Sequence, residues 1–133
     1  MFRLSVIVML LVAFLTSCSK EEGEGGTSVI TGKVYVQLYD DSGTYIINEY
    51  YAPEEDVYII YGNDEIYSDR FRTNYDGAYW FQYLREGNYT VFAYSEDLTG
   101  AVPSGVVAVK KNVKITNSDQ LVEVDDIIIQ KKD

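Results

Sequence analysis

Histidine is absent from the 133 residues of this chain, and cysteine occurs once, as Cys18. These two counts exclude a zinc site built from cysteine and histidine, an intrachain disulfide, and a catalytic triad or general base that needs an imidazole. Carboxylates are the abundant reactive groups, because 21 Asp and Glu stand against 11 Lys and Arg. The formal net charge of −10 argues against a protein that binds nucleic-acid phosphates through charge.

Paired carboxylates are the first chemistry that such a chain could support. A glycosidase-like site needs two carboxyl groups about 5 to 9 Å apart, one of them with a pKa raised by burial. The candidates are Glu54, Glu55, Asp56, Asp64 and Glu65. All five lie in polar, turn-like segments, and solvated turns explain them better than an active site does. We therefore expect no catalytic residue and no enzyme.

Calcium binding is the second chemistry, since the ion takes oxygen ligands from loops. Asp40, Asp41 and Ser42, or Asp125 and Asp126, could supply such ligands. No spacing matches an EF-hand loop, and the residues at 40–43 are those that a hairpin turn uses. The sequence predicts neither a metal nor any other cofactor.

Cys18 stands directly after an apolar run over residues 4–15. Twelve helical residues extend about 18 Å, less than the roughly 30 Å of a bilayer core, so the run predicts a signal peptide. The residues before the cysteine, Leu15, Thr16 and Ser17, resemble a bacterial lipobox, which implies cleavage after residue 17 and a lipid anchor on Cys18. The alternative is an ordinary secretory signal with an incidental cysteine. Residues 18–28 are charged and rich in glycine, which predicts a flexible tether.

The start of this tether also carries information about location. Ser19, Lys20, Glu21 and Glu22 resemble the acidic export signal of Bacteroidetes-type surface lipoproteins. The resemblance implies a protein anchored by acyl chains such as palmitate in the outer membrane and exposed at the cell surface. The periplasmic face of the outer membrane is the alternative.

Tyrosine is the most distinctive residue of the composition, with 13 copies. Flat aromatic faces with a polar rim suit sugar stacking and protein interfaces, and tyrosine pairs across strands also stabilise sheets. Tyr35 and Tyr39 share the polar face of the first predicted strand, and Trp80 follows another tyrosine. These three residues are the predicted ligand-binding side chains. Alternation is expected to bury about half of the tyrosines.

These side chains would be positioned by strands, because no stretch after residue 28 holds a 3.6-residue period. Short apolar and aromatic runs alternate with turn residues, and a loop is expected over residues 95–105. The pattern predicts one all-β domain over residues 29–133, an antiparallel β-sandwich of about seven to eight strands. The expected strands are 29–39, 44–51, 57–61, 66–72, 78–83, 88–94, 106–115 and 122–129.

Two segments of the chain resemble a family signature. Thr73-Asn74-Tyr75-Asp76-Gly77-Ala78-Tyr79-Trp80-Phe81 and Leu84-Arg85-Glu86-Gly87-Asn88-Tyr89-Thr90-Val91 are similar to the motifs of carboxypeptidase-regulatory-like domains, which are transthyretin-like or Cna-B-like sandwiches. The sequence departs from the family after Pro53, where acidic residues replace the usual glycine. The resemblance implies a transthyretin-like or Ig-like sandwich without catalysis, and it implies no ligand.

Two functions remain open from the sequence. The first is a non-catalytic, lipid-anchored envelope protein whose sandwich is a protein-binding, adhesion or assembly module. The second is a glycan-binding accessory lipoprotein of an outer-membrane polysaccharide-uptake system. The predicted partners are the membrane, through the acyl anchor, and an unknown protein or glycan, with no nucleic acid. Several coplanar exposed rings would favour sugar, whereas an apolar patch or a free sheet edge would favour protein.

Overall fold

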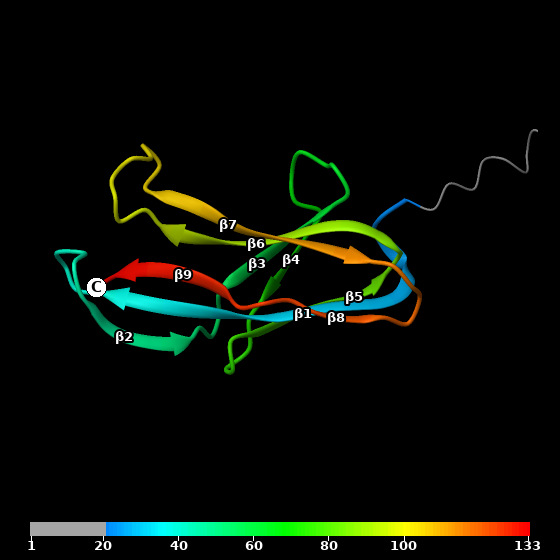
Figure 1. Ribbon diagram of the computed structural model, residues 1–133, viewed down its shortest axis with the longest axis horizontal. Helices are drawn as coiled ribbons and strands as arrows, with labels where there is room; N and C mark the ends of the chain where they lie inside the picture. The colour runs from blue at the N-terminus through cyan, green and yellow to red at the C-terminus, as the bar shows by residue number, and fades with distance from the viewer. Residues whose placement is uncertain (1–20) are drawn as a thin grey trace, which may run out of the picture.

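The computed structural model describes residues 21–133, which form nine strands and no helix. No helix that could cross a membrane is present in this part of the chain. The predicted signal peptide, residues 1–17, and Cys18 lie outside the described residues. The strands pack as two sheets of a β-sandwich, so the predicted fold class is confirmed (Figure 1).

The first sheet is built around β1 (Glu24–Tyr39), which has neighbours along both of its sides. On one side, the first half of β1 pairs with β5 (Ala78–Leu84) and the second half with β2 (Ile46–Tyr51), both antiparallel. On the other side, β8 (Leu121–Glu123) and β9 (Ile127–Lys132) follow one another parallel to β1. This sheet is therefore mixed, with two parallel pairings in a sandwich whose strands are mainly antiparallel.

The second sheet is antiparallel throughout, in the order β4-β3-β6-β7. Its strands are β4 (Asp69–Arg72), β3 (Asp56–Tyr61), β6 (Gly87–Glu96) and β7 (Val106–Ile115). In Figure 1 the long β6 and β7 hairpin lies over the layer that holds β1 and β9. The hairpin loop over residues 97–105 matches the expected long loop, shortened because β6 continues to Glu96.

Alternation along the strands explains the core. In β1 the side chains of Ile30, Val34 and Val36 are fully buried, and those of Thr31, Lys33 and Tyr35 between them point outward. Val57 and Ile59 of β3 do the same from the other sheet. The other hydrophobic residues with no exposed area are Tyr79, Val91, Ala93, Ile127 and Ile129.

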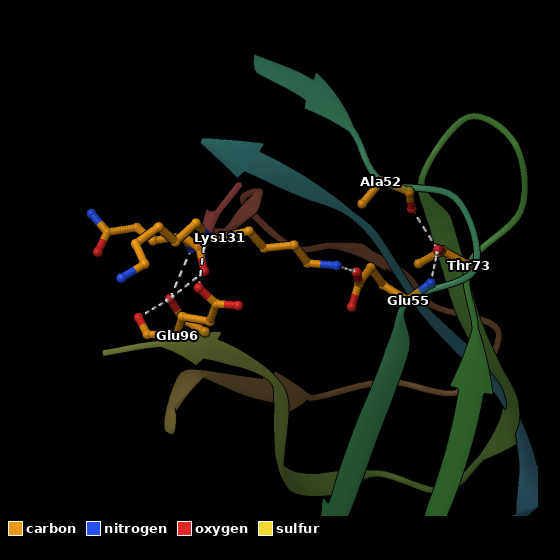
Figure 2. A network of polar contacts seen from close by, with 8 residues as sticks. Ala52, Glu55, Thr73, Glu96 and Lys131 are labelled. Carbon is orange, nitrogen blue, oxygen red and sulfur yellow. Dashed lines mark hydrogen bonds and ion pairs between the residues drawn. The ribbon is translucent and has the colours of Figure 1, made fainter. Parts of the chain in front are cut away.

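Polar contacts join the two sheets at their rims, and Figure 2 shows them. The ammonium group of Lys131 on β9 forms an ion pair with Glu55, at the start of β3. The Ser95 hydroxyl of β6 accepts a hydrogen bond from the Gln130 N–H of β9 at 2.8 Å. The buried Thr73 hydroxyl donates to the Ala52 carbonyl at 2.6 Å and accepts from the Glu55 N–H at 2.9 Å (Figure 2). These bonds connect segments distant in sequence, so they fix how the strands of the two layers meet.

The chain enters the sandwich earlier than the sequence predicts. β1 begins at Glu24 instead of residue 29, and the Gly23 N–H already donates to the Tyr89 hydroxyl at 2.9 Å. The Arg85 N–H donates to the Gly23 carbonyl at 2.9 Å, and Ser28 is fully buried. The expected flexible tether through residue 28 is corrected accordingly. Glycine-rich composition predicts flexibility, but here the absence of side chains lets the backbone approach Leu84 and Arg85 closely.

Two further boundaries differ from the prediction. The last expected strand, 122–129, is divided into β8 and β9, because the chain leaves β1 after Val124 donates its N–H to the Thr31 carbonyl. The strand expected over 66–72 is limited to β4, and the residues before it form a loop whose Ser68 N–H donates to the Ile59 carbonyl. Nine strands result, where the sequence predicts seven to eight.

Candidate binding surface

Four aromatic side chains cluster on the outer face of the four-stranded sheet, with Tyr58 at the centre. The Tyr58 ring stacks on Phe92 at 5.1 Å between centroids, with an interplanar angle of 18°. Tyr94 meets the Tyr58 ring edge-on at 5.6 Å, and Tyr67 contacts it at 4.7 Å with a tilt of 59°. Tyr67 and Tyr94 are half exposed. The cluster therefore offers solvent two aromatic rings that are held from behind by two others.

Strand alternation and register build this cluster. Val57 and Ile59 of β3 point into the core, so Tyr58 between them points outward. Tyr58 lies directly opposite Phe92 of β6, which places their rings in contact. Tyr67 comes from the loop that precedes β4, and this loop is tied to β3 by the bond from Ser68 to Ile59.

Three members of the cluster, Tyr67, Phe92 and Tyr94, line an open groove of about 560 Å³, which we call the aromatic groove. Its apolar wall includes Ile66, whose side chain is 79% exposed. Glu65 and Lys110 add one negative and one positive group to its lining. The full lining is Ile60, Glu65, Ile66, Tyr67, Phe92, Tyr94, Ala108 and Lys110.

A second hollow of about 380 Å³, which we call the amide pocket, lies farther along β6 and β7, toward the start of β6 and the end of β7. Amide and hydroxyl side chains dominate it, and the Thr90 hydroxyl donates to the Asn112 side chain at 3.3 Å. The lining is Gly62, Asn63, Asn88, Tyr89, Thr90, Asn112, Val113 and Lys114. The register pairs Asn88 with Lys114 and Phe92 with Lys110. One continuous outer face of β6 and β7 thus carries hydrogen-bonding groups at one end and aromatic rings at the other.

The structure places the predicted ligand residues on the other sheet. Tyr35 projects from the outer face of β1 and packs edge-on against Tyr51 at 5.2 Å. The Lys33 ammonium lies 4.8 Å from the Tyr51 ring centre, and the Tyr51 hydroxyl donates to the Asp126 carboxylate at 2.9 Å. That hydrogen bond raises the pKa of Tyr51. Tyr35 therefore belongs to a local network in which its ring faces another protein ring.

Tyr39 and Trp80 do not join Tyr35. Tyr39 lies four residues after Tyr35 on β1, and its hydroxyl accepts a hydrogen bond from the Gln130 side chain at 3.3 Å. Trp80 packs against Phe71 at 4.6 Å, where β5 and β4 border the two sheets. The three predicted residues thus have three different sets of neighbours, and the structure does not form one platform from them.

Sequence reasoning missed the aromatic cluster, although a signal was available. Tyr58 and Ile60 alternate with buried residues in β3, and Phe92 and Tyr94 do so in β6. The expectation that half of the tyrosines are buried is also wrong, because only Tyr79 and Tyr89 belong to the core. Most of the others lie on outer sheet faces and in turns.

Two of the five carboxylates considered for catalysis form ion pairs, and a carboxylate considered for calcium is held in its turn by hydrogen bonds. Glu55 pairs with Lys131, and Asp56 contacts Arg72 at 3.2 Å and Arg70 at 3.9 Å. Asp40 in its turn has a pKa below the usual range, because Ser42 and backbone N–H groups donate to it. Within residues 21–133 there is no cluster of three or more Asp, Glu, Cys or His side chains that could hold a metal ion.

With the sandwich and its outer face defined, the chain can be compared with known proteins. Its fold is that of a solved bacterial protein. The crystal structure is of a Pseudomonas aeruginosa protein described as a "putative carbohydrate binding protein", and it superposes with a TM-score of 0.51 at 14% sequence identity. The match covers 82% of this chain and 91% of the other. At this identity the likeness shows the fold alone. No known protein family and no curated protein matches the sequence.

Proposed function

We propose that this protein is a non-catalytic glycan-binding protein of the cell envelope, anchored by lipid on Cys18, with the outer face of β6 and β7 as its binding surface. The observation that carries the proposal is the union of the aromatic groove and the amide pocket on one continuous face. Sugar rings present apolar C–H faces and polar hydroxyl edges, so they need both kinds of surface. The description of the Pseudomonas aeruginosa protein, which shares the fold, supports the same class of ligand.

The proposed family is the carboxypeptidase-regulatory-like one, in a Bacteroidetes-type surface lipoprotein. The support for this family is that residues of its motifs form specific structural contacts in this chain. Asn74 accepts hydrogen bonds from the N–H groups of Asp76 and Ala78, each at 3.0 Å, and so closes the turn before β5. Gly77 has a φ of +74°, which side chains rarely adopt. The Tyr89 hydroxyl donates to the Arg85 carbonyl, just after β5, and accepts from the Gly23 N–H, just before β1.

The binding proposal is tested by removing single exposed rings. Tyr67→Ala and Tyr94→Ala should each weaken glycan binding about tenfold or more, because aromatic side chains dominate the binding energy where they contact a ligand. Tyr75→Ala is the matched control, since Tyr75 is 91% exposed in the turn before β5. The measurement is a glycan array followed by calorimetry on the glycans that bind. Unchanged affinity in both groove variants, or a loss in Tyr35→Ala instead, would refute this location.

The anchor is tested separately in cells. Cys18→Ala should abolish incorporation of labelled palmitate and release the protein from the membrane fraction. Palmitate that still enters this variant would contradict the lipid attachment. Protease added to intact cells then distinguishes the two orientations, since a surface protein is digested and a periplasmic one is protected.

A protein-binding module is the second candidate, and a different observation favours it. β2 is an edge strand, and Tyr45, Ile46 and Ile47 beside or within it are exposed by 71%, 44% and 52%. An exposed apolar edge can pair with a strand of another protein. A photo-crosslinking residue at position 47 should then capture a defined partner in intact cells, whereas the same residue at position 75 should not. Equal labelling from both positions would reject this candidate.

A further inference from the structure

The outer face of β7 carries two lysines that belong to the proposed glycan surface. Lys110, Asn112 and Lys114 are exposed and alternate with residues that face the other way. Lys110 lines the aromatic groove and Lys114 lines the amide pocket. Each part of the surface therefore contains one ammonium group.

Neither lysine is neutralised by an ion pair in the described part of the chain. The three ion pairs there use Arg70, Arg72 and Lys131. β7 contains no acidic residue, and β6 contains one, Glu96, at its far end. Glu65 is the one carboxylate in the lining of the aromatic groove, and the amide pocket has none. Glu22 accepts the Asn88 N–H at the amide-pocket end, and Lys114 also lines a hollow that contains Glu123 and Asp125. Within the linings of the aromatic groove and the amide pocket themselves, two ammonium groups stand against one carboxylate.

We propose that the surface selects acidic glycans, with Lys110 and Lys114 binding the carboxylate or sulfate groups of sugar units stacked along β6 and β7. This inference rests on the proposed glycan-binding function and adds the ligand class. Aromatic rings contact the sugar faces, amides bind the hydroxyl groups, and the lysines favour charge that a neutral glycan lacks.

The spacing of the two lysines limits the ligand further. Four residues along a strand separate them, a distance of about 13 Å. One acidic sugar can contact only one of these ammonium groups. An oligosaccharide that carries acidic groups more than one ring apart can contact both, so affinity should rise with chain length until both lysines are used.

The test compares acidic glycans with neutralised counterparts of the same backbone. The probes are oligogalacturonate and its methyl ester, alginate and its carboxyl-reduced form, and chondroitin sulfate and its desulfated, carboxyl-reduced form. We expect at least one acidic glycan to bind the full-length protein about tenfold more tightly than its counterpart. Lys110→Gln and Lys114→Gln should each weaken that binding about threefold and together about tenfold, which corresponds to about 1.4 kcal/mol. The difference should shrink as salt is raised, because the charges are exposed.

The control is a double variant with the same change of net charge. Lys111 is the neighbour of Lys110 on β7 and lies opposite the buried Val91, and Lys33 lies on the outer face of the other sheet. Lys111→Gln with Lys33→Gln should leave the acidic preference intact.

The possible outcomes separate the two proposals. If glycans bind equally well with and without their charges, or the Lys110 and Lys114 variants keep the preference, the selection of acidic glycans is refuted while glycan binding stands. If no glycan binds, both proposals are refuted. If single-stranded DNA binds as tightly as the best acidic glycan, the surface recognises polyanions in general, and the assignment to glycans is wrong.

Discussion

Replacing Tyr79 by phenylalanine should stabilise this protein, although Tyr79 is one of its largest core residues. The Tyr79 side chain is fully buried, and its hydroxyl has no hydrogen-bond partner among the described residues. The hydroxyl points toward Gly32, where a Cβ atom would lie only 2.5 Å from it. Burial of the hydroxyl raises the pKa of Tyr79, so the side chain is neutral at neutral pH.

The size of the effect follows from the cost of burying a hydroxyl. An unpaired buried hydroxyl costs about 1 to 3 kcal/mol in proteins. Removing the oxygen atom leaves a small gap, and the cost of this gap offsets the gain by a few tenths of a kcal/mol. Tyr79→Phe should therefore raise the free energy of unfolding by about 1 kcal/mol. In a urea titration this corresponds to a midpoint higher by about 0.5 M, with an unchanged slope.

The other buried tyrosine supplies the matched control. The Tyr89 hydroxyl donates to the Arg85 carbonyl at 2.7 Å and accepts from the Gly23 N–H at 2.9 Å. Tyr89→Phe leaves both backbone groups without this partner and should lower the free energy of unfolding by about 1 to 3 kcal/mol. The same chemical change is thus expected to have opposite signs at two core positions. A loss of 1 kcal/mol or more in Tyr79→Phe would show that its hydroxyl is bonded and would refute the reasoning.

Three other perturbations have defined outcomes. Thr73→Val removes a hydroxyl that bonds two backbone groups and should cost about 1 to 3 kcal/mol in the free energy of unfolding, measured by urea titration; no change would contradict the bridge. Gly77→Ala should cost more than about 1 kcal/mol in the same assay, because φ is +74° and the new Cβ would lie 3.0 Å from the Val34 carbonyl; a neutral result would show that the turn can move. The pKa of Asp97 is lowered by hydrogen bonds, from Thr99 first and then from the Val102 N–H, so its stabilisation of the 97–105 loop should be lost as pH falls below its ordinary value of 3.8. Hydrogen exchange of the Val102 amide, corrected for its intrinsic rate, should become faster below that pH. In the Asp97→Asn variant the same exchange should be fast at every pH.

The sequence predicts the fold because most strands show their buried and exposed sides in the alternation of their residue types. Val34 and Val36 alternate with outward-facing residues in β1, and the turn chemistry at Asn74 and Gly77 marks the start of β5, so both are visible without a structure. The parallel pairing of β8 and β9 with β1 leaves no such local mark. It depends on contacts between residues about 90 positions apart, as in the pair Val34 and Ile127.

The proposed binding surface is harder to predict for a related reason. Tyr35 and Tyr58 have the same local pattern, an aromatic residue between two buried ones. What distinguishes them is the neighbouring strand, since Tyr58 lies opposite Phe92 and Tyr35 lies opposite Tyr51 beside Lys33 and Asp126. A pattern of period two assigns a side chain to a face, but only the register decides which side chains share that face.

If Cys18 carries the proposed lipid, the early entry of the chain at Gly23 would set the position of the domain relative to a bilayer. Glu22 lies against Gly62 and Gly87, and its carboxylate accepts the Asn88 N–H at 3.4 Å, at the amide-pocket end of the binding surface. With a lipid on Cys18, as proposed, the four residues from there to Glu22 span at most about 14 Å. The amide pocket would then be held next to the headgroups. The aromatic groove, about four residues farther along β6 and thus about 13 Å away, would then lie on the side away from the headgroups.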